Sequence, residues 1–295
     1  MIGTVIVPLD GSELAAQALP YAKAIAEKSN TPIQLVWVVA QDAQASARDE
    51  AETYLHEQAK ALGDRAQISV RMGRPDEQIV QAADEATEPI IVMTTHGRSG
   101  FSRLFHGSVA EHVVRESQAP VLLIRHETKE RQDGPVRTIA VSLDGSVYAE
   151  AALPYAMEMA VDFDAEVLLV RVAETSQVYG MMGTEPVGPA SAEAFNEITE
   201  QLTKEAQDYL EATAARLRQD GLTVRTETLE GFPADQLMAL ERDMPVDVFV
   251  MATHGRSGLG RIVFGSVAER LLKNGTTPIL MIKPAGEVAD NSKGN

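Results

Sequence analysis

The sequence contains a long internal repeat, which limits the possible folds more than any other feature. The segment VIVPLDGS, residues 5–12, recurs as IAVSLDGS, residues 139–146. A second pair of segments, residues 95–111 and 253–269, is identical at 12 of 17 positions. The chain is therefore a tandem duplication, and any fold proposed for one copy must also account for the other.

The duplication predicts two domains. A chain of 295 residues is long enough for two domains that each bury a core of their own. We expect a first domain over residues 1–126, a second over residues 136–284 and a tail over residues 285–295. The spacing between matching segments grows from 134 to 158 residues within the second copy. That copy therefore carries an insertion, which we place near residues 174–190 because this segment is rich in glycine and proline.

Composition excludes several classes of protein. The chain has 43 acidic and 26 basic residues, a formal net charge of −17, and no cysteine. Disulfide frameworks, thiolate metal sites and cysteine nucleophiles are therefore excluded. The acidic excess disfavours nucleic acid and anionic membranes as partners, and no apolar run approaches the roughly 20 residues that cross a bilayer. The N-terminus lacks the basic region of a signal peptide, so we expect a cytoplasmic protein.

Short apolar runs alternate with longer helical patterns in each copy. In the first copy, strands are predicted over residues 4–8, 32–39, 66–72, 89–94 and 120–125, and helices over 12–29, 42–62, 75–86 and 108–116. This alternation predicts an α/β fold with two tandem copies of a five-stranded parallel sheet and helices on both faces. In such Rossmann-like sheets, ligands bind beyond the carboxyl ends of the strands. Pro20 and Pro154 fall inside the first helix of each copy, where we expect a kink.

The loop after the fourth strand is the most informative segment. It is THGRSGFSRLFHGS in the first copy and THGRSGLGRIVFGS in the second, and its glycines let the backbone approach a ligand closely. Neither segment contains an acidic residue, and each carries two arginines. Ser108 and Ser266 are predicted helix N-caps, where free N–H groups attract anions. We favour a phosphate site; a flexible loop with solvated arginines before a capped helix is the alternative.

Other kinds of site receive less support. The loop matches neither G-x-x-x-x-G-K-[ST] nor G-x-S-x-G. His96, His106 and His112 are close in sequence, but only His96 has a histidine counterpart in the second copy, so we expect no metal site. Asp10 and Asp144 each precede Gly-Ser at a strand-to-helix turn. There an aspartate either contacts a ligand or bonds local backbone N–H groups, and both interpretations stay open.

Taken together, these segments resemble the universal stress protein family in its tandem two-domain form. The resemblance rests on LDGS after the first strand and on [TA]-T-H-G-x₉-G-S, and it covers residues 1–284. Similarity to this family implies the strand order 3-2-1-4-5 in each copy. It also implies binding of ATP, with Mg²⁺, in members that keep the motif G-x₂-G-x₉-G-[ST].

The resemblance also implies which residues bind the nucleotide. Asp10 and Asp144 match the aspartate that recognises the nucleoside, and Val38 and Val172 match a second-strand residue whose backbone reads adenine. Thr94 and Ala252 replace the first glycine of the family motif, a departure that their small side chains should allow. The other candidates lie at strand ends and in the glycine loops: Pro8, Met93, Gly97, Arg98, Gly107, Ser108 and Val109, then Met251, Gly255, Arg256, Gly265, Ser266 and Val267.

Three functions are compatible with these residues. The first is a regulatory protein of the stress response that binds ATP in both copies. The second is a slow ATPase, although the loop has no lysine or carboxylate well placed as a general base for strong catalysis. The third is a nucleotide-free module that binds a protein partner, against which the retained glycines argue.

The fifth strands of the two copies have the character of apolar sheet edges. They are PVLLIR, residues 120–125, and PILMIK, residues 278–283. An uncovered apolar edge invites association, so we expect these two strands to pair with each other. We also expect sheet edges to be the surfaces through which a homo-oligomer would form.

Overall fold

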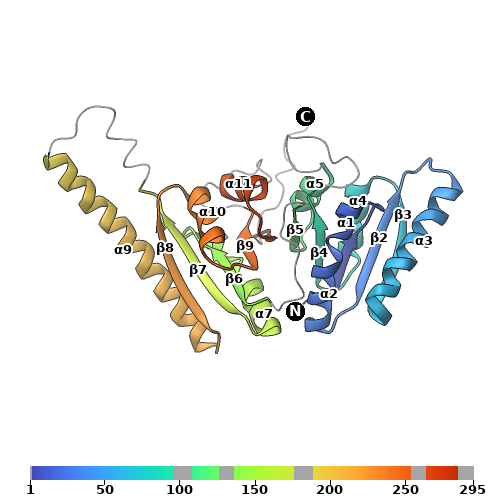
Figure 1. Ribbon diagram of the computed structural model, residues 1–295, viewed down its shortest axis with the longest axis horizontal. Helices are drawn as coiled ribbons and strands as arrows, with labels where there is room; N and C mark the ends of the chain where they lie inside the picture. The colour runs from blue at the N-terminus through green and yellow to red at the C-terminus, as the bar shows by residue number, and fades with distance from the viewer. Residues whose placement is uncertain (1, 96–107, 126–135, 176–188, 254–263, 285–295) are drawn as a thin grey trace, which may run out of the picture. The chain divides into compact units, whose positions relative to one another are not determined.

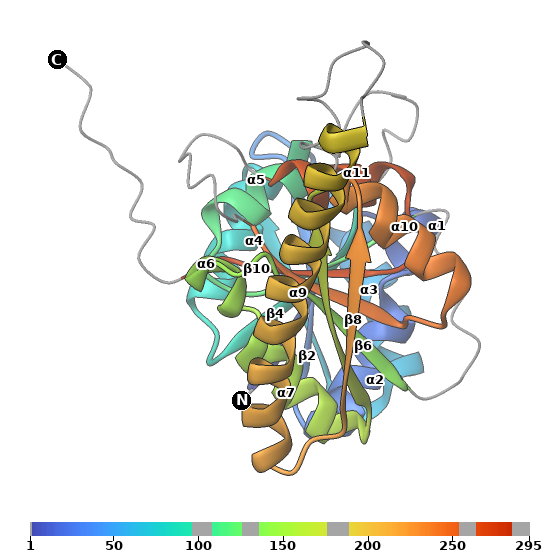
Figure 2. The same cartoon turned by 90° about the vertical axis from the view of Figure 1, so that its left-hand side faces the viewer.

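The computed structural model describes residues 2–95, 108–125, 136–175, 189–253 and 264–284. It divides into two compact units, residues 1–134 with 276–283 and residues 135–275 with 284–295. Figures 1 and 2 show helices flanking the strands in each unit. None of the helices in these described ranges is both long enough and apolar enough to cross a membrane.

The first unit alternates strands and helices along the chain. Its inner strands are runs of Val, Ile and Leu whose central residues, such as Ile6 and Ile91, are fully buried, as expected for a sheet covered on both faces. The edge strand over residues 66–72 is only partly buried. The elements are β1 (Thr4–Pro8), α1 (Glu13–Ala16), α2 (Leu19–Ser29), β2 (Ile33–Val39), α3 (Ala45–Leu62), the 3-10 turn η1 (Gly63–Arg65), β3 (Ala66–Met72), α4 (Pro75–Asp84), β4 (Pro89–Thr94), α5 (Ser108–Glu116), β5 (Val121–Ile124) and, from the second copy, β10 (Ile279–Ile282).

The strand order in the first unit is β3-β2-β1-β4-β5-β10. The first five strands are parallel, so the predicted order 3-2-1-4-5 is confirmed. β10 runs antiparallel to β5, with Leu280 opposite Leu122. The expected pairing of the two fifth strands is therefore confirmed, and it covers the apolar edge of β5.

Helix placement in this unit follows from the strand order. Along the strand order, the chain moves in one direction from β1 to β3 and in the opposite direction from β3 through β4 to β5, and crossovers between parallel strands are right-handed. Consequently α2 and α3 cover one face of the sheet, whereas α4 and α5 cover the other. α3 packs on β2 and β3 through Ala51 and Leu55, which lie one helical turn apart, and α4 packs against α5.

The second unit repeats this plan with the strand order β9-β6-β7-β8, all parallel. This order corresponds to 4-1-2-3 of the first copy and confirms the α/β class. The helix α9 packs on β7 and β8, and Figure 2 shows it lying along β8. The elements are β6 (Thr138–Ser142), α6 (Val147–Glu150), α7 (Leu153–Phe163), β7 (Glu166–Ala173), α9 (Pro189–Gln219), β8 (Val224–Glu230), α10 (Pro233–Asp243), β9 (Val248–Ala252) and α11 (Ser266–Asn274).

The predicted kink at the two prolines is a full break. The chain forms α1, turns at Gln17 and Ala18, and resumes as α2, with Pro20 in the first turn of the new helix. Pro154 has the same place in α7. Proline lacks an N–H, and the first-turn N–H groups of a helix have no intrahelical partner, so proline is tolerated at this position.

Candidate functional site

In the second unit, the carboxyl ends of three parallel strands lie at one edge of the sheet. β6 is the central strand, and its Val141 lies opposite Leu169 of β7 and Val250 of β9. Asp144 follows β6, and Val172 and Ala252 lie in the last two residues of β7 and β9. Parallel pairing therefore brings these predicted residues to the same edge, as expected for a Rossmann-like sheet.

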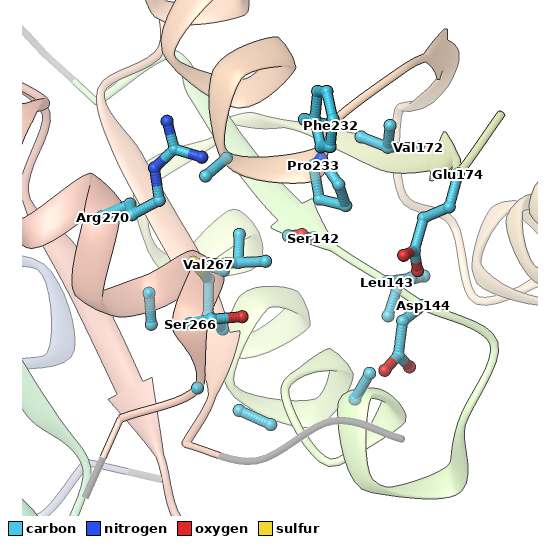
Figure 3. Close-up of a pocket in the computed structure, with 16 residues that line it drawn as sticks. Ser142, Leu143, Asp144, Val172, Glu174, Phe232, Pro233, Ser266, Val267 and Arg270 are labelled. Carbon is cyan, nitrogen blue, oxygen red and sulfur yellow. The ribbon is translucent and has the colours of Figure 1, made fainter. Parts of the chain in front are cut away.

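A cavity of about 450 Å³ opens at this edge (Figure 3). Its volume lies within the roughly 300–1,000 Å³ that is typical of small-molecule sites. The lining comes from the strand ends, the turn before α10 and the first turns of α6 and α11. It includes seven of the residues predicted from the sequence: Asp144, Val172, Met251, Ala252, Gly265, Ser266 and Val267.

Asp144 is held in place by the turn that follows β6. Its Oδ1 accepts a hydrogen bond from the N–H of Ser146 at 2.8 Å. The hydroxyl of Ser146 in turn accepts from the N–H of Ala149 at 3.2 Å and caps α6. Gly145 between them has a φ of +85°, a conformation that glycine adopts without strain. The turn thus fixes the Asp144 carboxylate at the cavity wall, so local bonding and ligand contact are compatible.

The first turn of α11 forms another part of the wall. The structure places the N-cap at Gly265 and starts the helix at Ser266, so the prediction of Ser266 as the N-cap is wrong by one residue. The first helical hydrogen bond runs from the N–H of Glu269 to the carbonyl of Gly265 at 2.9 Å. The N–H groups of the first helical turn have no intrahelical partner, and Ser266, Val267 and Ala268 line the cavity. This end of the cavity favours a negatively charged group.

The two sides of the cavity differ in charge. Figure 3 shows the carboxylates of Asp144 and Glu174 together on one side, with Ser266 and Arg270 of α11 on the other. Arg270 forms an ion pair with Asp235 of α10. Apolar groups complete the wall: Figure 3 shows Leu143 beside the carboxylates, Val267 beside Ser266, and Pro233 between the two sides. A ligand that carries an anion at one end and hydrogen-bond donors at the other matches this arrangement.

Part of this wall comes from residues that the sequence did not predict. The turn between β8 and α10 contributes Phe232, whose side chain is 59% exposed although it lines the cavity. A signal was present, because Gly-Phe-Pro directly follows the third strand of the copy and so lies at the same sheet edge. The other lining residues outside the predicted set are Ser142, Leu143, Ala149, Glu174, Pro233, Ala234, Ala268 and Arg270.

The first unit has the same edge, built from the corresponding strands. Pro8 ends β1 and Thr94 ends β4, whereas Val38 lies one residue before the end of β2. Met93 and Thr94 are buried, and Ser108 and Val109 begin α5. Oδ1 of Asp10 accepts from the N–H of Ser12 at 3.0 Å and from its hydroxyl at 2.6 Å, which repeats the turn at Asp144.

The two edges differ in their side chains. Arg74 of the first copy occupies the N-cap position that Phe232 has in the second. Its guanidinium donates to Oδ2 of Asp76 at 2.8 Å and lies 3.2 Å from Oε1 of Glu77. Nδ1 of His112, the counterpart of Arg270, lies 3.4 Å from the same oxygen of Asp76. Polar contacts through Asp76 therefore link the turn before α4 to α5 in the first unit, where the second unit exposes an aromatic ring.

Several predicted residues lie outside the described part of the chain. They are Gly97, Arg98 and Gly107 in the first copy and Gly255 and Arg256 in the second. Most of the predicted insertion, residues 176–188, and the tail, residues 285–295, also lie outside it.

Comparisons with known proteins agree with the repeat and with the sheet order. The sequence profile of the Universal stress protein family matches residues 1–125 and residues 135–283. Universal stress protein MJ0531 of Methanocaldococcus jannaschii is 35% identical over 147 residues, which are 50% of this chain and 82% of that protein. Universal stress protein Rv2005c of Mycobacterium tuberculosis is 23% identical over 299 residues, which cover 95% of this chain and 96% of that protein.

A solved structure has the same fold along nearly the whole chain. The crystal structure of a universal stress protein from Archaeoglobus fulgidus superposes with a TM-score of 0.70 and 19% identity, covering 97% of each chain. The family profile matches twice and together spans most of the sequence. The chain is therefore a member of the universal stress protein family, with two tandem copies of the family fold.

Proposed function

We propose that the chain is an ATP-binding regulatory protein with one nucleotide site in each copy, in domains that extend over residues 1–126 and 136–284. The nucleotide would lie at the carboxyl ends of the strands, with its phosphates and Mg²⁺ toward the glycine loop and the first turn of the following helix. Binding of ATP would stabilise one conformation or assembly and so report the state of the cell in a stress response.

One observation carries this proposal, namely the arrangement of opposite charges around the cavity of the second copy. The first turn of α11 offers N–H groups to phosphate oxygens, and the Asp144 carboxylate can accept hydrogen bonds from ribose hydroxyls. The apolar residues of the lining, including Val172 and Met251, suit a flat base. The cavity volume of about 450 Å³ leaves room for a nucleotide. The family resemblance supports the same ligand in the first copy, whose strand ends carry Asp10 and Val38.

Identification of co-purified nucleotide tests the proposal directly. The purified protein is denatured, and the released small molecules are identified by mass spectrometry and compared with titration of the stripped protein by ATP. Release of ATP, or saturable ATP binding at up to two sites per chain, is expected. A protein that releases no nucleotide and binds none would instead be a nucleotide-free partner-binding module.

Turnover then separates a sensor from a slow ATPase. The described lining of the cavity contains no lysine, and its two carboxylates, Asp144 and Glu174, lie on the side away from α11. A general base near the terminal phosphate is therefore missing from this part of the chain. Phosphate release with Mg²⁺ and ATP should stay near the uncatalysed background, and steady multiple turnover would identify the chain as an enzyme.

A further inference from the structure

We propose that Phe232 stacks on the base of a nucleotide bound at the second site, at a position where the first copy has Arg74. This inference rests on the proposed nucleotide site. Phe232 is the only aromatic side chain among the described residues that line the cavity, and its exposed ring stands beside Pro233 and Val172 (Figure 3). An exposed ring on the wall of a cavity offers a flat apolar face to a base.

The backbone holds Phe232 in position before any ligand arrives. Gly231 has a φ of +126°, and its N–H donates to the carbonyl of Ala173 at the end of β7 at 3.0 Å. Pro233 fixes the next backbone torsion, and the carbonyl of Phe232 accepts from the N–H of Gln236 at 3.0 Å. Because this turn is anchored on both sides, stacking would order little more than one side chain.

The position of the ring relative to the polar groups indicates which part of a nucleotide it meets. Phe232 lies near Val172 and Glu174, on the side of the cavity formed by the turn after β8 and the end of β7 (Figure 3). Ser266 and the first turn of α11 lie across the cavity from Glu174 (Figure 3). A nucleotide with its phosphates at α11 and its ribose toward Asp144 would therefore place its base against Phe232.

The first copy provides an internal comparison at the same backbone position. Gly73 has a φ of +131° and donates to the carbonyl of Val39 at 2.9 Å, just as Gly231 donates to Ala173. The next residue, however, is Arg74, which is engaged by Asp76 and Glu77. The two turns share their backbone and differ in the side chain, so stacking on an aromatic ring at this position is specific to the second site.

Binding of probes with and without a base tests the inference. ATP, inorganic tripolyphosphate and 2-aminopurine riboside triphosphate are titrated into the parent protein and into Phe232→Ala, Phe232→Trp and Arg74→Ala. Phe232→Ala should weaken ATP binding at one site by about fivefold to 100-fold, the range for stacking of one base. Affinity for tripolyphosphate should not change. 2-Aminopurine fluorescence should be quenched on binding to the parent and to Phe232→Trp, and less so with Phe232→Ala.

The controls separate failure of this inference from failure of the proposed function. Phe232 is exposed and its backbone role needs no ring, so Phe232→Ala should fold, as shown by an unchanged unfolding midpoint. Arg74→Ala should leave ATP affinity within twofold of the parent. If the parent binds ATP and Phe232→Ala binds it equally well, the stacking role is overturned while the nucleotide site stands. If the parent binds neither ATP nor tripolyphosphate, the proposed function falls, and the stacking role falls with it.

Discussion

The guanidinium carbon of Arg171 lies 4.8 Å from the ring centroid of Tyr209, so a cation–π contact joins β7 to α9. The hydroxyl of Tyr209 donates to Oε1 of Glu150 at 2.9 Å. In the first copy, Trp37 has the place of Arg171 and meets Tyr54 edge-on, with the ring centroids 5.3 Å apart. In each copy, a side-chain contact therefore joins the second strand (β2 or β7), which ends at the candidate site, to the helix that follows it (α3 or α9).

Replacing Tyr209 with phenylalanine should reveal the hydrogen bond to Glu150. Partial burial, followed by the neighbouring Glu150, raises the pKa of Tyr209 above its usual value. The substitution should cost about 1 kcal/mol of unfolding free energy at pH 7. Above pH 10 the unfolded parent loses the tyrosine proton before the folded parent does, so the parent loses stability and the difference shrinks. Urea unfolding between pH 7 and pH 11 measures this; a constant difference would contradict it.

Asp76 should make the first copy sensitive to acid. Partial burial alone would raise its pKa, but hydrogen bonds from Arg74 and from the N–H of Glu77, with His112 nearby, bring the pKa below its usual value. Its stabilising contribution is therefore complete above about pH 4 and is lost as the pH falls through the lowered value. Asp76→Asn should lower stability at pH 7 by about 1 kcal/mol and flatten the dependence below pH 5.

The outcome for Asp76 depends on its partners. Arg74→Ala removes the hydrogen bond from Arg74 to Asp76 and should reproduce part of the weaker dependence of stability on pH. The parent should keep the full dependence. Unfolding midpoints measured from pH 3 to pH 7 provide the comparison. Equal slopes for the parent and Asp76→Asn would mean that other carboxylates govern acid unfolding.

The sequence alone predicted the positions of those candidate-site residues that lie at the ends of the repeated strands. The alternation of strands and helices fixes a parallel sheet, and parallel strands bring their carboxyl ends to one edge. Asp144 and Val172 could therefore be placed near each other without coordinates. The pairing of β5 with β10 followed in the same way, because an apolar edge such as Val121–Ile124 requires a cover.

The place of Phe232 in the cavity wall and the first residue of α11 depend on geometry that the sequence pattern does not contain. Phe232 follows β8, which pairs with β7 and not with β6, and the sequence pattern does not show whether a side chain of this turn reaches the cavity beside β6. β8 stays paired with β7 as far as Glu230, which lies opposite Ala173, and the hydrogen bond from Gly231 to the carbonyl of Ala173 holds the turn at the end of β7. Likewise, serine is a common N-cap, but the bond from Glu269 to the carbonyl of Gly265 decides where α11 starts.

The strand β10 should contribute strongly to the stability of the first unit. Ile279 is 1% exposed and lies opposite Leu123 of β5. Ile279→Ala should therefore cost about 2–5 kcal/mol, the range for a buried isoleucine that leaves a cavity. The matched control is Ile198→Ala on α9, where the side chain is 47% exposed and the cost should stay below about 1 kcal/mol. Denaturant unfolding measures both, and equal losses would mean that β10 adds little to this unit.

Gly265 allows ligand space to be probed without disturbing the backbone. Its φ of −58° is open to any residue, and among the residues that the structure describes a Cβ built there would meet the carbonyl oxygen of Thr253, at the ordinary distance of 3.5 Å. Since Gly265 lines the cavity at the start of α11, a larger side chain would occupy the space that phosphate oxygens need. Gly265→Val should weaken ATP binding at the second site tenfold or more, through loss of charge-assisted hydrogen bonds. Its unfolding free energy should stay within about 1 kcal/mol of the parent.

Gly221→Ala is the converse control for this prediction. Gly221 has a φ of +86° in open space outside the cavity, so the variant should lose about 1 kcal/mol of stability and no ATP affinity. Calorimetric titration with ATP compares the three proteins, and unchanged affinity in a folded Gly265→Val protein would mean that phosphate does not lie at the start of α11.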